Sequence, residues 1–331
     1  MELSWKREKL ILKEPFTISY GSYTRRESLI VRLSHNAIQG FGECVLIDYY
    51  GISLDAFEQK LQNVKVIIET LDVKHPKEFY AIISATITDS FLLSALDCAY
   101  WDLYGKLQQK SFAELNGLGL KMPESTLTIS IAPEDVQMQA MAGSSWNSFK
   151  VKFDTFDLKH ILNLLESGKN IAIDANTTFS REDCAQLEQI SAARELLYIE
   201  QPQPVGKYDV LNKNSNVLWM ADEDFQNQKD LERLQPYYSA VNLKLMKCGG
   251  LTPALEQISA AKRLGLKVMI GCMTESSVGI SAGIAVAALC DFADLDGANL
   301  ISNDFARGSF VENGRLVRSE NPGLGIEYPN F

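Results

Sequence analysis

From Leu127 onward, short apolar runs alternate with amphipathic stretches along the chain. Eight such runs are present, and this alternation is the pattern of consecutive β-strand and α-helix units. The runs cover residues 126–131, 148–153, 170–176, 196–202, 217–223, 240–246, 267–273 and 292–297. Eight parallel strands with intervening helices predict an α/β fold of the (β/α)8 barrel type, in which the active site lies at the carboxyl ends of the strands.

The first 120 residues have a different pattern. Strand-like segments are expected around residues 3–13, 27–33 and 38–44, followed by helical periodicity. The clearest helix is expected over residues 89–109, where apolar side chains recur every three to four positions and form a wide stripe. These features predict an α+β domain. The tail after the last strand is too short to fold alone, so we expect it to return to this domain.

Composition limits the classes of partner. The 331 residues include 32 basic and 42 acidic ones, for a net charge of −10, which disfavours nucleic acid as a partner. The six cysteines show no metal-binding spacing and no disulfide framework, and a reducing cytoplasm is the expected location. No apolar run approaches the length of a membrane span. We therefore expect a soluble cytoplasmic protein, and a homo-oligomer is compatible with this sequence.

Charged residues interrupt the apolar runs at a nearly constant spacing. Lys152, Asp174, Glu200, Asp222 and Lys244 each fall near the end of a successive run, and the pair Asp294 and Asp296 falls in the last run. Because the carboxyl ends of all barrel strands share one face, we expect these side chains to converge on one mouth of the barrel.

The three carboxylates of Asp174, Glu200 and Asp222 would repel one another in a partly desolvated mouth unless a cation neutralised them. Ligation by oxygen alone favours Mg²⁺, and Mn²⁺ can substitute for it. The alternative is that these acids form salt bridges with the lysines or cap the following helices. Three acids in successive strands favour the metal site over that alternative.

The lysines suggest proton transfer. Lys150 and Lys152 lie on one face of their strand, and Lys244 faces the same centre from the opposite side of the barrel. A neutral lysine is a base, and a divalent cation stabilises the enediolate formed when a proton alpha to a carboxylate is removed. Two bases on opposite faces predict racemisation or epimerisation. Lys150 is expected to tune the site electrostatically, with an ion pair to a neighbouring acid as the alternative.

Several motifs carry a resemblance to a known family. They are FGEC (41–44), ALDCAYWDLYGK (95–106), KVK (150–152), IDAN (173–176), IEQP (199–202), ADED (221–224), NLKLMKCGG (242–250), GCMTESS (271–277) and DLDG (294–297). With this ordered set the sequence resembles the enolase superfamily, its muconate-lactonising-enzyme subgroup and, within that, the dipeptide epimerases.

The resemblance implies a fold and a set of roles. The fold is a modified (β/α)7β TIM-type barrel over residues 121–307, capped by an α+β domain of residues 1–120 that the tail, about 308–331, completes. The implied metal ligands are Asp174, Glu200 and Asp222, and the implied acid/base pair is Lys152 and Lys244. The histidines His35, His75 and His160 lie away from the seventh strand, which disfavours the mandelate-racemase-like branch.

The resemblance also implies a substrate. In dipeptide epimerases a DxD pair at the eighth strand, here Asp294 and Asp296, receives the α-ammonium group, and this spacing places both carboxylates on one strand face. A DxD that only opens the following helix is the alternative. The implied reaction is epimerisation of the carboxyl-terminal residue of a dipeptide, most commonly L-Ala-D/L-Glu.

The cap loop leaves the preferred side chain open. Relatives acting on Ala-Glu can carry an arginine or lysine near residue 20, whereas this chain has Tyr20 and Tyr23, with Arg25 and Arg26 slightly later. An arginine contact, with Arg25 the candidate, favours an acidic side chain, and inward tyrosines favour apolar ones. Solvated arginines are the further alternative.

Three rival functions remain. An N-acylamino-acid racemase or o-succinylbenzoate synthase belongs to the same subgroup, and a non-catalytic small-molecule-binding barrel belongs to another class. A glycosidase using two acids is disfavoured because lysines flank the carboxylates.

Overall fold

An antiparallel sheet and its helices form the amino-terminal part of the molecule. In the computed structural model, which describes residues 1–18 and 21–331, the sheet order is β1-β2-β3. The predicted strands and the predicted helix, now α3, are confirmed, and β1 and β2 extend beyond the predicted ends. The strands are β1 (Glu2–Ile18), β2 (Gly21–His35) and β3 (Ile38–Val45), and the helices are α1 (Leu54–Thr70), α2 (Pro76–Ser84), α3 (Ser90–Gln108) and α4 (Phe112–Asn116).

Helix α3 packs directly against strand β3. A Cβ atom added at Gly40 or Gly42 would lie 2.3 or 2.0 Å from the backbone oxygens of Ala99 and Ala95. Only glycine allows the two backbones to approach this closely. The glycine of FGEC is therefore explained by packing of the cap on its own helix.

Eight parallel strands form the barrel, in the order β11 to β4 without interruption. A bridge between Ser125 and Ala293 links the two edges, so the sheet is nearly closed. The strands are β4 (Leu127–Ile129), β5 (Ser148–Lys152), β6 (Asn170–Asp174), β7 (Ile199–Glu200), β8 (Trp219–Ala221), β9 (Ala240–Lys244), β10 (Lys267–Gly271) and β11 (Phe292–Asp294). Each of the eight apolar runs contains one of these strands, as predicted.

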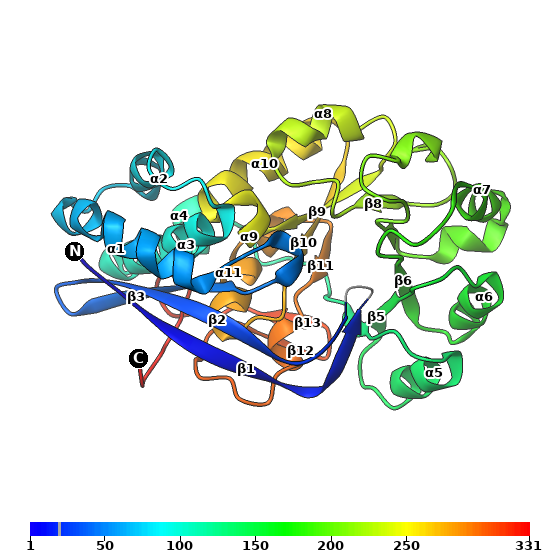
Figure 1. The fold of residues 1–331 in the computed structure, drawn as a ribbon, viewed down its shortest axis with the longest axis horizontal. Coiled ribbons are helices and arrows are strands. Elements are labelled where there is room, and N and C mark those ends of the chain that lie inside the picture. Colours follow the sequence, from blue (N-terminus) through cyan, green and yellow to red (C-terminus); the bar gives the residue numbers. More distant parts are fainter. Residues whose placement is uncertain (19–20) are drawn as a thin grey trace.

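Helices surround the barrel strands (Figure 1). They are α5 (Glu134–Ala142), α6 (Leu158–Glu166), α7 (Arg181–Gln189), α8 (Leu231–Leu234), α9 (Leu245–Cys248), α10 (Leu251–Arg263) and α11 (Ser277–Val286). After β11 the described chain forms a 3-10 helix at Gly297–Asn299 in place of an eighth α-helix, which agrees with a (β/α)7β barrel. Within the described ranges, no helix combines the length and apolar character required to cross a membrane.

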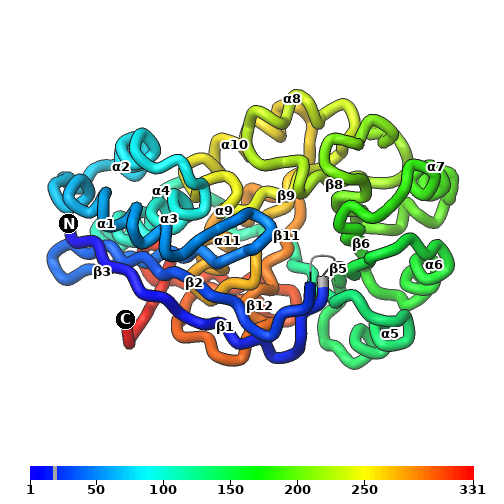
Figure 2. The backbone as a smooth tube through the Cα atoms, in the orientation of Figure 1, coloured from blue at the N-terminus to red at the C-terminus, as the bar shows by residue number. Residues whose placement is uncertain are grey.

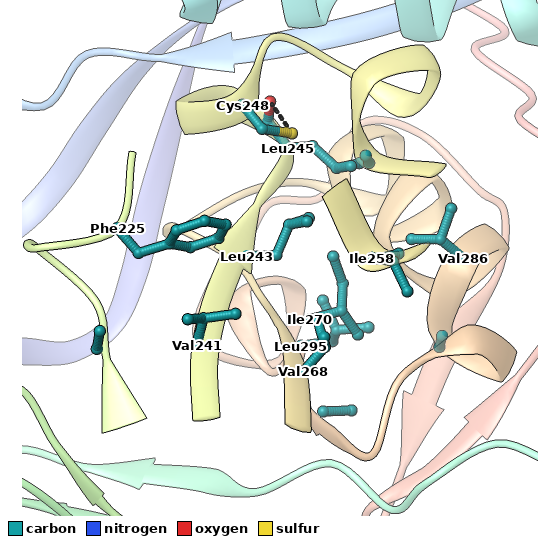
Figure 3. Packing of buried hydrophobic residues seen from close by; sticks show 14 of the residues in the cluster. Phe225, Val241, Leu243, Leu245, Cys248, Ile258, Val268, Ile270, Val286 and Leu295 are labelled. Atoms are coloured by element: carbon teal, nitrogen blue, oxygen red, sulfur yellow. Dashed lines mark hydrogen bonds between the residues drawn. The ribbon is translucent and has the colours of Figure 1, made fainter. Parts of the chain in front are cut away.

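Three apolar clusters support this architecture, and the smallest, on or next to the barrel strands, consists of Ala172, Tyr198, Met220, Ala240 and Met269. The largest one fills the space between the barrel strands and their helices, where Val241, Leu243 and Ile270 pack with Ile258 and Val286 (Figure 3). The second lies between the β1–β3 sheet and helices α1 to α3. Side chains at the carboxyl ends of the barrel strands that lie outside these apolar clusters can therefore be polar.

The sheet of the cap reaches across the barrel mouth. The tube view shows β1 and β2 running from the amino terminus to the region of β5 (Figure 2). There the Ile131 amide donates a hydrogen bond to the Thr17 carbonyl at 3.1 Å. This contact places residues of the first hairpin over the strand ends that carry the lysines.

Two buried carboxylates of the cap bind the amino-terminal ends of barrel helices. Glu43 on β3 accepts hydrogen bonds from Ser276 Oγ at 2.6 Å and from the Gly279 amide at 3.0 Å, at the start of α11. Asp97 on α3 accepts from the amide and hydroxyl of Thr252 in α10, both at 2.7 Å. A helix amino terminus presents free N–H groups that favour a negative charge. These contacts fix the cap against the helices that follow β9 and β10.

The tail contains the hairpin β12 (Phe310–Glu312) and β13 (Arg315–Val317) and then returns to α3. The Leu324 amide donates to Asp102 Oδ1 at 2.8 Å, and Lys106 Nζ donates to the Ile326 carbonyl at 2.7 Å. The apolar side chains of the tail pack within the largest cluster, beside Phe41, Trp101 and Phe112 of the amino-terminal region. The tail thus contacts both parts of the molecule.

Candidate active site

A cavity of about 120 Å³ lies between the barrel mouth and the cap. Strand ends supply its polar lining, and the hairpin β1–β2 and the segment after β3 supply most of its apolar lining. The polar residues include Lys150, Lys152, Asp174, Asn176, Asp222, Lys244, Asp294 and Asp296, and the cap contributes Phe16, Arg26, Ile47, Tyr49 and Tyr50. All the predicted barrel site residues except Glu200 line this cavity.

Strand register explains this convergence. Lys152 is paired with Asp174 across β5 and β6, and Asp174 is paired with Glu200 across β6 and β7. Asp222 follows β8 directly, and Lys244 is the last residue of β9. Each predicted residue therefore occupies the carboxyl end of its own strand, and Glu200 is completely buried beneath the cavity floor.

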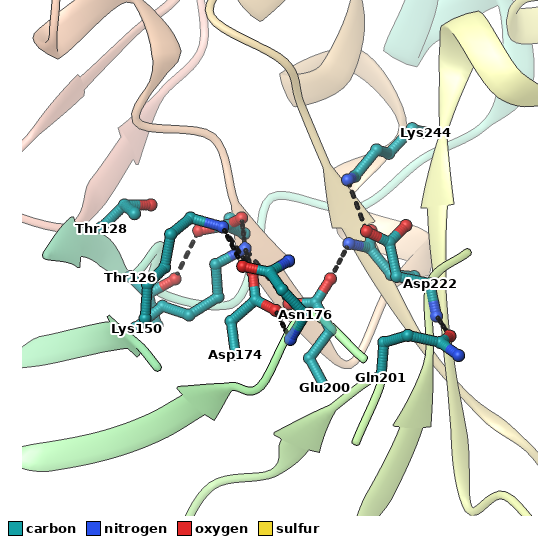
Figure 4. A network of polar contacts seen from close by, with 12 residues as sticks. Thr126, Thr128, Lys150, Asp174, Asn176, Glu200, Gln201, Asp222 and Lys244 are labelled. Carbon is teal, nitrogen blue, oxygen red and sulfur yellow. Dashed lines mark hydrogen bonds and ion pairs between the residues drawn. The ribbon is translucent and has the colours of Figure 1, made fainter. Parts of the chain in front are cut away.

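Each of the two lysines proposed as acid/base residues contacts a different carboxylate. Lys152 Nζ donates to Asp174 Oδ2 at 2.6 Å. Lys244 Nζ donates to Asp222 Oδ2 at 2.7 Å (Figure 4). Lys152 also donates to Asn176 Oδ1 at 3.3 Å. The two ammonium groups thus enter one cavity from strands β5 and β9, with the carboxylates between them.

Lys150 makes the ion pairs that its alternative interpretation predicts. Its ammonium group contacts Asp294, lies 3.1 Å from Glu200 Oε2 and lies 3.9 Å from Asp174 Oδ2. The residue is only 4% exposed. It therefore acts as a common counter-ion for three acids and holds the centre of the site together.

In this structure each of the three carboxylates implied as metal ligands forms an ion pair with a lysine. No group of three acidic, histidine or cysteine side chains in residues 1–18 and 21–331 is gathered closely enough to hold a metal ion. The salt bridges that were the alternative to a metal site are present at Asp174, Glu200 and Asp222. The shared ion therefore stays a prediction.

The donor set nevertheless fits a hard divalent cation. The three acids end adjacent strands and offer oxygen ligands alone, as Mg²⁺ requires. Glu200 Oε2 is buried without a hydrogen-bond partner among the described atoms and has only the ammonium of Lys150 nearby. A buried oxygen in this state is suited to a cation. Binding would require Lys152 and Lys244 to release their carboxylates.

Burial and the neighbouring charges shift the pKa values of the buried acids and of Lys244 in opposite directions. Burial disfavours the charged form of Asp222, but Lys244 and Lys247 outweigh it and hold the pKa of Asp222 below its usual value. Burial raises the pKa of Glu200 to about 7, with Lys150 offsetting part of the effect. Burial would lower the pKa of Lys244, yet Asp222 and Glu200 raise it well above the usual value. Lys244 is therefore an ammonium group as long as it contacts Asp222.

The DxD pair divides into two different environments. Asp294 is bound by Lys150 and accepts a hydrogen bond from Thr126 Oγ1 at 2.7 Å. Asp296 accepts from the Thr128 amide at 2.6 Å, and burial together with the charge of Asp294 raises the pKa of Asp296 to about 7. Asp296 thus has no lysine partner of its own among the described residues.

The structure places a different arginine of the cap at the cavity from the one predicted. Tyr20 lies outside the described residues, and its contact with the substrate stays a prediction. Arg25 is exposed and does not line the cavity, in contrast to the expectation that it reaches the substrate. Arg26 takes that place instead, because successive residues of β2 point to opposite faces. Tyr23 packs its ring against the Arg26 guanidinium at 3.4 Å.

Three buried residues of the site were not singled out from the sequence. Asn242 Nδ2 donates to Glu200 Oε1 at 2.6 Å, and Lys247 Nζ donates to Asp222 Oδ1 at 2.5 Å. Glu223 lines the cavity, and burial beside Asp222 raises its pKa to about 8. The signal for Asn242 was available, since it lies two residues before Lys244 on the same strand face.

Comparison with known families places the chain. Residues 2–117 match the amino-terminal domain of mandelate racemase and muconate lactonizing enzyme, and residues 134–330 match the enolase C-terminal domain-like family. An L-Ala-D/L-amino acid epimerase of a Maribacter species is 34% identical over 98% of this chain and 99% of its own length. An L-Ala-D/L-Glu epimerase of Bacteroides thetaiotaomicron is 32% identical over 98% of this chain and 88% of its own length.

A solved structure agrees with these matches. The dipeptide epimerase of Methylococcus capsulatus, complexed with Mg and L-Arg-D-Lys, superposes with a TM-score of 0.91 at 26% identity, covering 99% of each chain. The sequence matches and the barrel with its cap point to the same group. The chain therefore belongs to the mandelate racemase and muconate lactonizing enzyme family of the enolase superfamily, where its relatives include dipeptide epimerases.

Proposed function

We propose that this chain is a Mg²⁺-dependent dipeptide epimerase that inverts the α-carbon of the carboxyl-terminal residue of a dipeptide. The observation that carries the proposal is the pair of lysines on opposite strands. Lys152 on β5 and Lys244 on β9 line one cavity, and each contacts a different carboxylate of the acidic trio. An α-carbon held between them can lose a proton to one lysine and receive a proton from the other.

Each group of the site has a part in this reaction. Lys244 is an ammonium group here, so it fits the donor of the incoming proton, and the roles of Lys152 and Lys244 exchange when the reaction runs in reverse. Asp174, Glu200 and Asp222 would hold Mg²⁺, with Mn²⁺ as a substitute. The cation stabilises the negative charge that develops on the substrate carboxylate. Lys150 keeps the buried acids together during these changes.

Asp296 is proposed as the ligand of the substrate's α-ammonium group. Lys150 and Thr126 already satisfy Asp294, whereas Asp296 accepts one amide hydrogen bond and lines the cavity. A carboxylate binds an amine through charge-assisted hydrogen bonds. Asp294 would then position Lys150 and support Asp296, and only Asp296 would touch the amine.

Arg26 supports a preference for an acidic side chain on the epimerised residue, as in L-Ala-D/L-Glu. The residue is 6% exposed and lines the cavity, and its Nε has no hydrogen-bond partner in the described part of the chain. Stacking on Tyr23 holds the guanidinium group in place. A buried arginine that forms no ion pair with a carboxylate of residues 1–18 and 21–331 fits a substrate carboxylate, which guanidinium binds in a bidentate manner.

Solvent deuterium incorporation tests the reaction itself. A dipeptide library incubated with the enzyme and Mg²⁺ in D₂O should gain one deuterium at the α-carbon of the carboxyl-terminal residue, with conversion to a mixture of epimers. Removal of metal by a chelator should abolish the exchange, and Mg²⁺ should restore it. Exchange on N-acyl amino acids with none on any dipeptide would replace the proposal with racemisation of that class. Release of free amino acids would indicate hydrolysis.

The side-chain preference has its own test. The ratio of kcat/KM for L-Ala-L-Glu over L-Ala-L-Gln should exceed one for the wild type and fall by about 10- to 100-fold in Arg26→Met, the effect of losing a hydrogen bond to a charged group. Arg25→Met, at the exposed neighbouring position, is the matched control and should keep the wild-type ratio. A wild-type preference for Gln or for apolar residues would contradict the role of Arg26 and leave the epimerase proposal intact.

A further inference from the structure

Lys247 is a buried lysine whose hydrogen bonds, within the described ranges, all go to one residue of the proposed metal site, while its ammonium group also lies 6.0 Å from the centre of the Phe225 ring. Its side chain is 1% exposed. Its ammonium group donates to Asp222 Oδ1 at 2.5 Å and to the Asp222 carbonyl at 2.7 Å. The two acceptors belong to the side chain and the backbone of the same residue, so Lys247 restricts rotation of the Asp222 carboxylate about its side-chain torsions.

The two oxygens of Asp222 are therefore occupied by two different lysines. Lys247 contacts Oδ1, and Lys244 contacts Oδ2. Lys244 lines the cavity, whereas Lys247 lies in α9 behind Asp222 and does not reach the cavity. Lys244 can exchange Asp222 for a substrate atom, but Lys247 cannot. Lys247 consequently touches no reacting atom and is not a catalytic residue.

The neighbouring carboxylate shows what Lys247 adds. At Asp174, Lys152 and Lys150 both lie nearest to Oδ2, and Oδ1 accepts a hydrogen bond from the Asn176 amide. That backbone amide fixes Asp174 from behind. At Asp222 the equivalent amide, that of Asp224, donates to Gln201 Oε1 at 3.2 Å instead, and the corresponding outer oxygen is held by a lysine side chain. Lys247 thus replaces a backbone donor.

We propose that Lys247 is a positioning residue that holds Asp222 with Oδ2 directed into the cavity, so that Asp222 is preorganised to bind the divalent cation. This inference rests on the proposed function only through the metal site. When Lys244 leaves Asp222 for the substrate, Lys247 keeps its two hydrogen bonds on that residue. Groups that orient a metal ligand in this way typically contribute 10- to 100-fold to affinity.

Direct metal binding tests the proposal without reference to turnover. Titration of the full chain with Mg²⁺ by calorimetry, and with Mn²⁺ by electron paramagnetic resonance, should give dissociation constants about 10- to 100-fold weaker in Lys247→Met than in the wild type. Lys247→Gln retains a donor of similar length without the charge and is expected to weaken binding as well. It provides the measurement if the methionine variant does not fold.

Lys106 offers a matched control. Its ammonium group also binds one carboxylate, Asp102 at 2.7 Å, together with backbone carbonyls, but it lies at the junction of α3 and the tail. Lys106→Met should lower the free energy of unfolding in a comparable way and leave the metal dissociation constants unchanged. Wild-type metal affinity in either Lys247 variant, or equal weakening in Lys106→Met, would overturn the proposal. Absence of metal binding by the wild type would overturn it too.

The outcomes also separate this inference from the epimerase proposal. A wild type that binds Mg²⁺ but exchanges no dipeptide proton would refute the proposed reaction, while a loss of affinity in Lys247→Met would still support the role of Lys247. Dipeptide exchange in the wild type with unchanged metal affinity in Lys247→Met would support the proposed reaction and refute the role of Lys247.

Discussion

Glu200 and Asp294 are the last residues of different strands, β7 and β11, yet they share one counter-ion. The Lys150 ammonium lies 3.1 Å from Glu200 Oε2 and pairs with Asp294. Burial would lower the pKa of Lys150, but Asp294, Glu200 and Asp174 raise it well above its usual value. One permanently charged lysine therefore links the proposed metal site to the proposed amine site.

Removing this charge should damage both stability and activity. Lys150→Met leaves buried carboxylates without a partner, a change that typically lowers the free energy of unfolding by about 3–5 kcal/mol. Urea unfolding at pH 8 measures the loss. Lys150→Arg keeps the charge and should retain more stability than the methionine variant. Equal stability of wild type and Lys150→Met would show that the ion pairs contribute nothing net.

Each acid/base lysine should be indispensable to epimerisation. Lys152→Ala and Lys244→Ala are each expected to reduce the rate of epimer conversion by at least about 10²- to 10⁴-fold, since one face of the α-carbon then lacks its proton carrier. Chiral chromatography of the dipeptide measures the rate, and circular dichroism checks the fold. Lys169→Ala is the control, because Lys169 binds the Trp146 carbonyl away from the cavity. Normal turnover in either site variant would refute the two-base mechanism.

The pH dependence of substrate binding should report Asp296. Its pKa, raised to about 7, means that Asp296 is protonated below this pH and becomes a carboxylate above it. The kcat/KM for dipeptides should therefore fall as the pH decreases through 7, mainly through KM. Asp296→Asn should have a higher KM and a flatter profile between pH 6 and 8, whereas an unchanged KM and profile would exclude Asp296 as the amine ligand.

Asp97 should make the folded state less stable at higher pH. Burial raises the pKa of Asp97 to about 7 from its ordinary value of 3.8, against the opposing hydrogen bonds of Thr252. The folded state thus binds an extra proton between these values, so the free energy of unfolding decreases as the pH rises through this window. For this one group the decrease is on the order of 4 kcal/mol.

Urea unfolding of wild type and Asp97→Asn at pH 5 and pH 8 isolates this effect. The variant should lose less stability between the two pH values than the wild type, because asparagine does not titrate. Its amide oxygen can still accept the hydrogen bond from the Thr252 amide. Identical pH dependence of the two proteins would mean that Asp97 is charged, or uncharged, throughout the range.

The sequence predicted where these barrel side chains come together, because the signals for their position are local. A strand places its last side chain at a known end of the sheet, so the spacing of Asp174, Glu200 and Asp222 was sufficient to place them on adjacent strands. Apolar runs likewise located the strands. These inferences needed no knowledge of which side chains meet across the barrel.

Contacts between distant segments could not be predicted in the same way. Arg25 and Arg26 are adjacent and equally charged, and a shift of one residue in strand register exchanges the face to which each points. Whether Lys150 serves the acids or the substrate depends on the distance between β5 and β11 across the barrel. Lys247 lies on a helix, where strand alternation gives no information. In each case the deciding fact is tertiary.

Because the tail packs back on α3, some contacts of this helix can form only at the end of protein synthesis. Domains generally fold as they leave the ribosome, the earliest segments first. Here the Asp102 carboxylate and the Lys106 ammonium, both on α3, bind Leu324 and Ile326 of the tail. These two tail residues are translated after the whole barrel, so the contacts cannot form earlier. The nascent amino-terminal layer therefore lacks these two contacts until the end of translation.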